Sequence, residues 1–437
     1  MAGLVQNIEL MGQNLSDLQK LRAEAREAFA MPQPRDEAWK YTKLRELDVD
    51  DYVMGCSIIN TLHQNCNFEQ SSGSSFSPAG GNCYQIYFNN GVFSPYGSRL
   101  PDDMEIYPLI EAFLPRSCQC KTADGTCNND DYCDARKYLN RNIDYIKYPF
   151  AALNSAYLQE GLFIRIGGKP DKPLVIVNFT ETEENLFYNT RNLIILEDGA
   201  EAEVLEVFEY GGDVKSRYFG NHVNEIVVGK GAKLNHYKLQ NEAFKANNVA
   251  LSVAEVAEGG KYHHFCLQKG ANLARNEVVV KLLDRGAEAR VDGAYVMYGW
   301  ATLDTTTSIE HLAPFTYSNQ LVKGVIGGDA RGVFQGKIHI GREAVKTEGI
   351  QQHRALLLSD TAEIDCKPEL EIFADDVKCS HGAASGELDE DVLFYMESRG
   401  ISREEAKQIL IDAYLDEVID KVENTAVREF FKQKLSS

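Results

Sequence analysis

The chain has 437 residues, with 45 Lys and Arg against 65 Asp and Glu, which gives a formal net charge of −20. A chain this acidic repels a phosphate backbone, so we expect no nucleic-acid partner. The hydrophobic content of 44% and the charged content of 25% are close to globular averages, which argues against a disordered or fibrous chain. The sequence contains no apolar run of transmembrane length and no signal-peptide pattern, so we expect no membrane association and a cytoplasmic location.

Residues 1–150 are predicted to form a mostly helical N-terminal domain. Ser16 can cap a helix that stops before Pro32, and a second short helix starts near Asp36. This second helix should turn Trp39 and Leu44 toward a core. Residues 57–82 are polar and rich in Ser, Gly and Asn, which is typical of a loop.

Four cysteines lie in a polar insert near residues 116–147: Cys118, Cys120, Cys127 and Cys133. Zinc sites usually pair ligands two to four residues apart, and these spacings are looser. A surface insert with adventitious thiols is therefore favoured over a structural metal site, although the role of these cysteines stays open.

Residues 151–385 are predicted to form a β-solenoid core. Short runs rich in Val, Ile, Leu and Tyr are separated by glycine corners, and this pattern is typical of strands. The corners at Gly199, Gly231, Gly259 and Gly286 recur about every 30 residues, within the range of structural repeats. Stacked rungs would bury a continuous interior. A β-sandwich is the alternative, but so long a strand-rich region with few prolines favours the solenoid.

Residues 386–437 are predicted to form a C-terminal helical domain. One helix begins at Glu390 and closes at Gly400, and Ser402 with Glu405 forms a capping box for the next. An apolar stripe is expected from Ala406, Ile409, Leu410, Ala413, Tyr414 and Val418. Three short helices cannot build a core of their own, so they must dock on the solenoid or on a partner protein.

Common catalytic motifs are missing from the sequence. The nearest approach to a phosphate-binding loop is GVFQGK, from Gly332 to Lys337, which has the wrong glycine spacing. We find no dinucleotide fingerprint, no zinc-protease motif and no nucleophile elbow. The chain is therefore predicted not to be an enzyme of these classes.

Two residues with metal-binding potential are Cys379 and His381. In a strand they point to the same face, where a thiolate and an imidazole would suit iron–sulfur or zinc chemistry. Two ligands are too few for a closed site, so the site is open or is completed by a second chain. The alternative is a buried thiol beside a hydrogen-bonded imidazole.

The other late cysteines and histidines are predicted to have structural roles. Cys366 alternates with Ala362 and Ile364 on what should be an inward face, which predicts a core residue. His263 and His264 should point to opposite faces of a strand ahead of Cys266. His311, His339 and His353 are predicted to be polar positions with satisfied hydrogen bonds.

At this point the sequence shows a family resemblance. The segment from Pro368 to Ser402, PELEIFADDVKCSHGAASGELDEDVLFYMESRGIS, closely resembles the C-terminal signature of the SufD family of the Suf iron–sulfur cluster assembly machinery. The similarity extends upstream from Ile372 to Ile309, and more weakly to stretches beginning at Ala152 and Glu37. The wording DDVKCSHGA favours SufD over SufB. The GAASGELDE continuation is a mild variant, and the cysteine insert has no counterpart in the family.

The resemblance implies a right-handed parallel β-helix flanked by helical domains, paired with a SufB-like homologue and docking a SufC-like ATPase. It places His381 at the SufB interface, where a transient iron–sulfur cluster is shared with the partner. Direct ligation by Cys379 is less certain than by His381. No cofactor is expected to stay bound in the isolated chain, for which a homodimer is possible.

The resemblance also implies that the C-terminal helices dock the ATPase, and the residues expected to do so are Leu393, Tyr395, Ile409, Leu410 and Tyr414. The function expected is that of a non-catalytic scaffold. One alternative is a purely structural adaptor without a ligand role. Another is a β-helix enzyme acting on polysaccharides, which the lack of an evident ladder of acidic residues disfavours.

Overall fold

The computed structural model describes residues 16–33, 35–42, 44, 47, 52–54, 81–94, 103–110, 137–211 and 217–436. Most of the predicted 57–82 loop lies outside these residues. So do Cys118, Cys120, Cys127 and Cys133, the four cysteines of the predicted insert.

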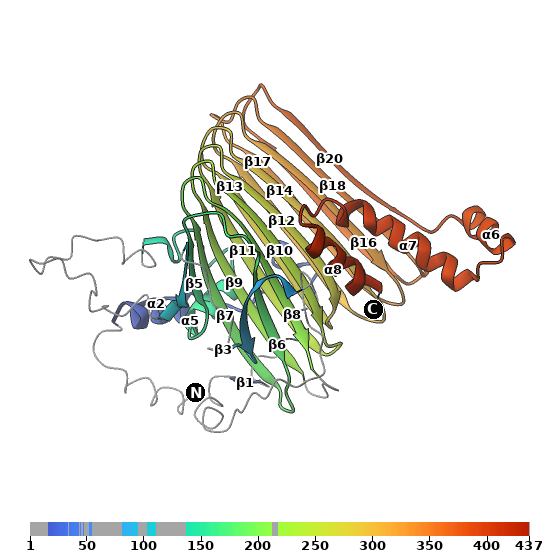
Figure 1. Cartoon of the computed structure of the whole chain (residues 1–437), viewed down its shortest axis with the longest axis horizontal. Coiled ribbons are helices and arrows are strands. Elements are labelled where there is room, and N and C mark those ends of the chain that lie inside the picture. Colours follow the sequence, from blue (N-terminus) through green and yellow to red (C-terminus); the bar gives the residue numbers. More distant parts are fainter. Residues whose placement is uncertain are drawn as a thin grey trace, which may run out of the picture.

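The core is a parallel β-solenoid, as predicted. Successive strands alternate between two sheets, and within the described residues each sheet has ten strands. Strands of adjacent rungs pair in parallel, so Figure 1 shows them stacked side by side along the length of the molecule. The first sheet contains β5 (Leu162–Ile166), β7 (Leu186–Leu196), β9 (Tyr218–Val228), β11 (Ala246–Val256), β13 (Leu273–Leu282), β15 (Thr302–His311), β17 (Arg331–Ile340) and β19 (Glu363–Ile372). The second contains β6 (Leu174–Thr180), β8 (Glu201–Tyr210), β10 (Lys233–Glu242), β12 (Lys261–Gly270), β14 (Glu288–Met297), β16 (Tyr317–Ile326), β18 (Glu348–Leu357) and β20 (Lys378–Gly386).

The predicted glycine corners are the turns between rungs. Gly199, Gly231, Gly259 and Gly286 all have φ between 62° and 74°, a backbone conformation that disfavours side chains with a Cβ. Each lies between a strand of the first sheet and the next strand of the second. The sequence spacing of these corners therefore reports the length of one rung.

The interior of the solenoid contains both aliphatic and polar side chains. An aliphatic cluster runs through successive rungs, with Ile164, Ile176 and Val204 fully buried. Polar side chains are buried beside it: Lys238 lies against Asn276, and His236 bonds Glu206 at 2.8 Å. Such groups stay in the interior because they bond one another.

The N-terminal segments either pack against the first sheet or join the two sheets as additional strands. They comprise α2 (Ser16–Ala28), the 3₁₀ turn η1 (Glu37–Trp39), β1 (Val53–Met54), β2 (Tyr84–Asn89), β3 (Val92–Ser94), β4 (Met104–Pro108) and α5 (Pro149–Ala156). Trp39 and Leu44 are buried as predicted, and Trp39 packs on Phe150 with ring centroids 5.0 Å apart. The strands β1 to β4 were not predicted from the sequence. Of these, β2 and β4 extend the two sheets at the first rung.

Three helices follow the last strand: α6 (Glu390–Ser398), α7 (Arg403–Ile419) and α8 (Thr425–Ser436). The helix ends are those predicted. The Ser402 side chain accepts a hydrogen bond from the Glu405 backbone N–H at the start of α7, and Gly400, after α6, has φ 91°. The second half of α7 and all of α8 lie across the outer face of the second sheet, while α6 projects away from the solenoid (Figure 1).

The predicted stripe on α7 is only partly correct. Ala406 and Val418 are buried, but the docked face continues through Ile411 and Leu415 while Ile409 is exposed. The face was misassigned because the first half of α7 packs on α6 and the second half on β14 and β16.

The packing of α8 on the second sheet should depend on Phe431. Phe431 is fully buried, and its ring lies 5.1 Å from that of Phe265 on the sheet. Phe431→Ala should lower the free energy of unfolding by about 3–5 kcal/mol, because it leaves a cavity between helix and sheet. Urea denaturation followed by circular dichroism measures this, with Phe394→Ala, at a site that is 72% exposed, as the control. Equal midpoints for the two variants would contradict it.

No helix among the described residues combines the length and the apolar character that crossing a membrane requires.

Candidate functional site at the terminal rung

The last rung of the solenoid, formed by β19 and β20, is here called the terminal rung. In the described part of the chain, β19 pairs with β17 alone and β20 with β18 alone, so each has one unpaired edge. Most residues of both strands are exposed or half-buried, whereas equivalent positions in earlier rungs are buried. The inward-facing side chains of the terminal rung are therefore left uncovered at this end of the solenoid.

Cys379 and His381 both belong to the inward face of β20. A Cβ on Gly349 would lie 3.5 Å from Cys379 Sγ, and Cys379 packs against the buried cluster that contains Ile338 and Ile340. His381 pairs in register with Gln351, which points inward and is fully buried. Strand alternation puts the two residues on one face, as the sequence predicted. His381 is nevertheless exposed, because no further rung covers it.

A chain of amide hydrogen bonds supports the position beneath His381. Gln351 donates to the Gly336 carbonyl at 3.2 Å and accepts from Gln320, which in turn accepts from Thr307 at 2.6 Å. A Cβ on Gly336 would lie 2.4 Å from Gln351 Nε2, so the absence of a side chain there makes room for the amide. The rung below His381 is thus joined by side-chain hydrogen bonds, although the rung of His381 is open.

The two donors differ in readiness to bind a metal ion. Desolvation raises the pKa of the Cys379 thiol, so this sulfur must lose a tightly held proton before it can act as a ligand. A neutral imidazole binds through its free nitrogen without losing a proton. Ligation by Cys379 would therefore release a proton, whereas ligation by a neutral imidazole would not.

Within the described residues, no cluster of three or more His, Cys, Asp or Glu side chains is positioned to hold a metal ion. A site built on Cys379 and His381 would consequently need donors from another chain.

Cys366 differs from the sequence prediction. It faces inward, as its alternation with Ile364 predicted, but it is exposed rather than a core residue. The reason is its place on β19, the last strand of its sheet. Its Sγ lies 3.1 Å from Nδ1 of the buried His353, a pairing that strand alternation alone did not predict because the two residues belong to different sheets.

The remaining histidines are mostly as predicted. His311 is buried between the hydroxyls of Thr316 and Ser318, at 2.8 Å from each. His339 contacts Glu371 at 3.2 Å. His264 faces the interior and His263 the outside.

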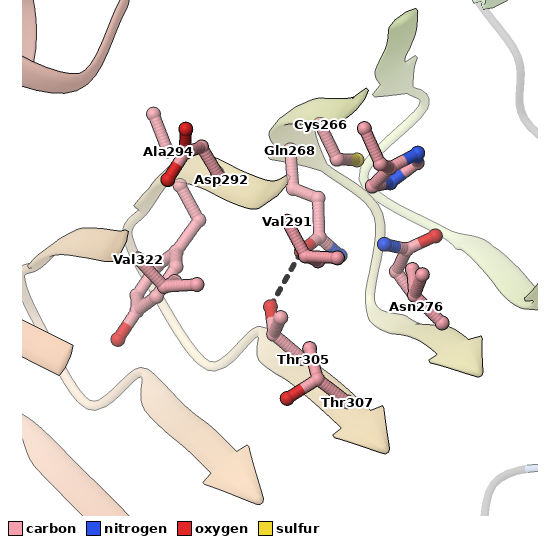
Figure 2. Close-up of a pocket in the computed structure, with 13 residues that line it drawn as sticks. Cys266, Gln268, Asn276, Val291, Asp292, Ala294, Thr305, Thr307 and Val322 are labelled. Carbon is pink, nitrogen blue, oxygen red and sulfur yellow. Dashed lines mark hydrogen bonds between the residues drawn. The ribbon is translucent and has the colours of Figure 1, made fainter. Parts of the chain in front are cut away.

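One cavity inside the middle rungs is too small to hold a substrate. Figure 2 shows the largely buried side chains around one internal cavity, with Thr305 donating to Gln268 at 2.8 Å. Its volume of about 10 Å³ has room for a single water molecule.

A larger hollow lies at the turns between the sheets. Its described lining includes Arg217, Lys245, Phe244 and Trp300 and contains no carboxylate. Glycoside cleavage by hydrolases usually needs a pair of carboxylates, so this hollow lends no support to the polysaccharide alternative.

The predicted docking residues lie in different environments on the C-terminal helices. Tyr395 is 58% exposed and Ile409 is 43% exposed, and both belong to the projecting α6–α7 hairpin. Leu393 is buried. Leu410 and Tyr414 are half-buried, and the Tyr414 carbonyl accepts from Lys323 of the sheet at 2.8 Å. The hairpin is braced by Arg403, which contacts Glu390 and Glu397 of α6.

Together, these features define a parallel β-solenoid with an open terminal rung and a projecting helical hairpin. Residues 179–414, more than half of the chain, match the family described as SUF system FeS cluster assembly, SufBD core domain. The chain belongs to this family.

Three relatives show how far the similarity extends. A SufBD family protein for iron–sulfur cluster assembly from Synechocystis sp. is 26% identical over 94% of this chain and 88% of its own length. The iron–sulfur cluster assembly protein SufD of Escherichia coli is 32% identical over 61% of this chain and 63% of its own length. The chloroplastic protein ABCI7 of Arabidopsis thaliana is 33% identical over 61% and 58%. The last two alignments span less than two thirds of those relatives. The similarity as a whole is consistent with a SufD-like member.

Proposed function

We propose that this chain is a non-catalytic scaffold subunit of a Suf-type complex, pairing with a SufB-like homologue and docking a SufC-like ATPase in the cytoplasm. The observation that carries the proposal is the terminal rung, where His381 faces an uncovered opening with two unpaired strand edges. A second solenoid placed end to end there would satisfy the edges and bring its own ligands to His381. Iron and sulfide are then the substrates, and the nascent cluster is held by two chains.

The projecting hairpin supports the second part of the proposal. It carries the exposed apolar residues Val392, Phe394, Tyr395 and Ile409, while α7 is anchored on β14 and β16. Exposed apolar patches of this kind mark protein interaction sites. Movement of a bound ATPase would pull on the rungs through α7 and change the separation between the two solenoids at His381.

Native mass spectrometry under anaerobic conditions tests this proposal. The chain is co-expressed with the SufB-like and SufC-like proteins of its own organism. We expect one SufB-like chain, two SufC-like chains and one copy of this chain, carrying iron and sulfide. Detection of a monomer or homodimer with neither partner bound would contradict the proposal. The family relationship would then describe the fold alone.

A further inference from the structure

A second pair of donors lies in the same opening as His381. Cys366 Sγ is 3.1 Å from His353 Nδ1, although Cys366 belongs to one sheet and His353 to the other. His353 registers with Ala383 of β20, two positions along the strand from His381. The pair therefore opens on the terminal rung, and the proposed role of His381 leaves it unused.

His353 is held by its neighbours. Its ring stacks on Phe334 at 4.7 Å between centroids, and its Nε2 lies 2.9 Å from the Tyr295 hydroxyl. The imidazole is fully buried, so its orientation is set by packing and by this hydrogen bond. A histidine fixed through one nitrogen presents the other to a ligand in a defined direction, as in most metal sites.

The contact with Tyr295 depends on a missing side chain. Tyr295 and His353 lie on strands two rungs apart, and Gly324 is the register partner of Tyr295 on the strand between those two. A Cβ on Gly324 would lie 1.9 Å from Tyr295 Cζ, so only glycine lets the tyrosine ring cross that rung. The line of contacts from Tyr295 through His353 to Cys366 thus crosses several rungs and ends at the opening.

In the metal-free chain, the Cys366 thiol and the His353 imidazole share one hydrogen bond. Burial lowers the pKa of His353 to about 3, so the imidazole is neutral. Desolvation, with a contribution from Asp365, raises the pKa of Cys366 to about 11, so the sulfur carries a proton. The thiol can then donate to Nδ1 while Nε2–H donates to Tyr295. When a cation replaces the thiol proton, Cys366 Sγ and His353 Nδ1 both face that cation.

We propose that Cys366 and His353 bind a thiophilic divalent cation through Sγ and Nδ1 at the terminal rung. One proton is released to solvent as the metal–sulfur bond forms, and the imidazole contributes its lone pair. Zinc bonds of about 2.3 Å to sulfur and 2.0 Å to nitrogen place the two donors about 3.5 Å apart, so a small rotation of the thiol suffices. Solvent or a partner fills the other positions. Resting on the proposed function, the cation carried in the assembled complex is ferrous iron.

The test uses zinc as the probe on the full chain without partners. Iodoacetamide alkylation is followed by peptide mass spectrometry, which reads the rate at each cysteine separately. We expect zinc to slow alkylation of Cys366 at least tenfold in the wild type and less than twofold in His353→Gln. Tyr295→Phe keeps the ring but not the hydroxyl, and it should lose part of the protection, as a positioning residue would.

Two results would overturn the inference: no effect of zinc on Cys366 in the wild type, or undiminished protection in a folded His353→Gln variant. Should His353→Gln fail to fold, zinc bound per chain is compared between the wild type and Cys366→Ser. An equal stoichiometry would then reject the site. The proposed function is tested separately, because a Cys366→Ser chain should still form the three-component complex.

Discussion

His381→Ala should leave the three-component complex intact and abolish its iron–sulfur cluster. The side chain is exposed on a strand edge, so its removal should change the free energy of unfolding by less than about 0.5 kcal/mol. It removes the imidazole that the proposed function assigns to the cluster. Iron and sulfide per complex, measured after anaerobic purification, should fall to background.

His339→Ala is the matched control for this experiment. His339 lies on the adjacent sheet near the same end, but it faces outward and contacts Glu371. Its replacement should leave the cluster content unchanged. A normal cluster yield in His381→Ala would contradict the ligand role of His381 and favour the purely structural adaptor.

The double substitution Tyr395→Asp and Ile409→Asp should weaken docking of the SufC-like ATPase. Both side chains are exposed apolar groups on the α6–α7 hairpin, and a charge placed in an apolar interface must be desolvated without a partner. A loss of about 2 kcal/mol, typical of an interface hot spot, corresponds to about 30-fold weaker binding. Titration of the purified ATPase, followed by calorimetry, measures the dissociation constant.

Phe244→Asp serves as its control, because Phe244 is a comparably exposed apolar residue on a distant turn of the solenoid. It should bind the ATPase as the wild type does. If the hairpin variant also binds normally, the ATPase docks elsewhere and Tyr395 and Ile409 are not in its interface. Pairing with the SufB-like chain should be unaffected in both variants.

The solenoid could be predicted from the sequence because its turns are chemically distinctive. Gly231 and Gly259 take left-handed backbone conformations that favour glycine, and their spacing fixes the rung length. The shared face of Cys379 and His381 followed from strand alternation alone. Local rules were sufficient wherever the structure repeats.

Features that depend on which segments meet could not be predicted in this way. The inward position of Cys366 was expected, but its exposure depends on β19 being last in its sheet. Its pairing with His353 joins two sheets, and no spacing along the chain encodes that contact. The docked face of α7 shifted for a related reason, since different halves of one helix contact different neighbours.

The unpaired edges of the terminal rung imply a gradient of local stability along the molecule. Every interior strand of the solenoid has a hydrogen-bonded neighbour on each side, whereas β19 and β20 have one each among the described residues. In stacked repeats, stability is largely a sum of neighbour terms, so the last rung opens most readily. Amide hydrogens there should exchange sooner than those of β12 or β14. A partner that pairs with these edges would slow the amide exchange, and the same pairing would fix the position of His381.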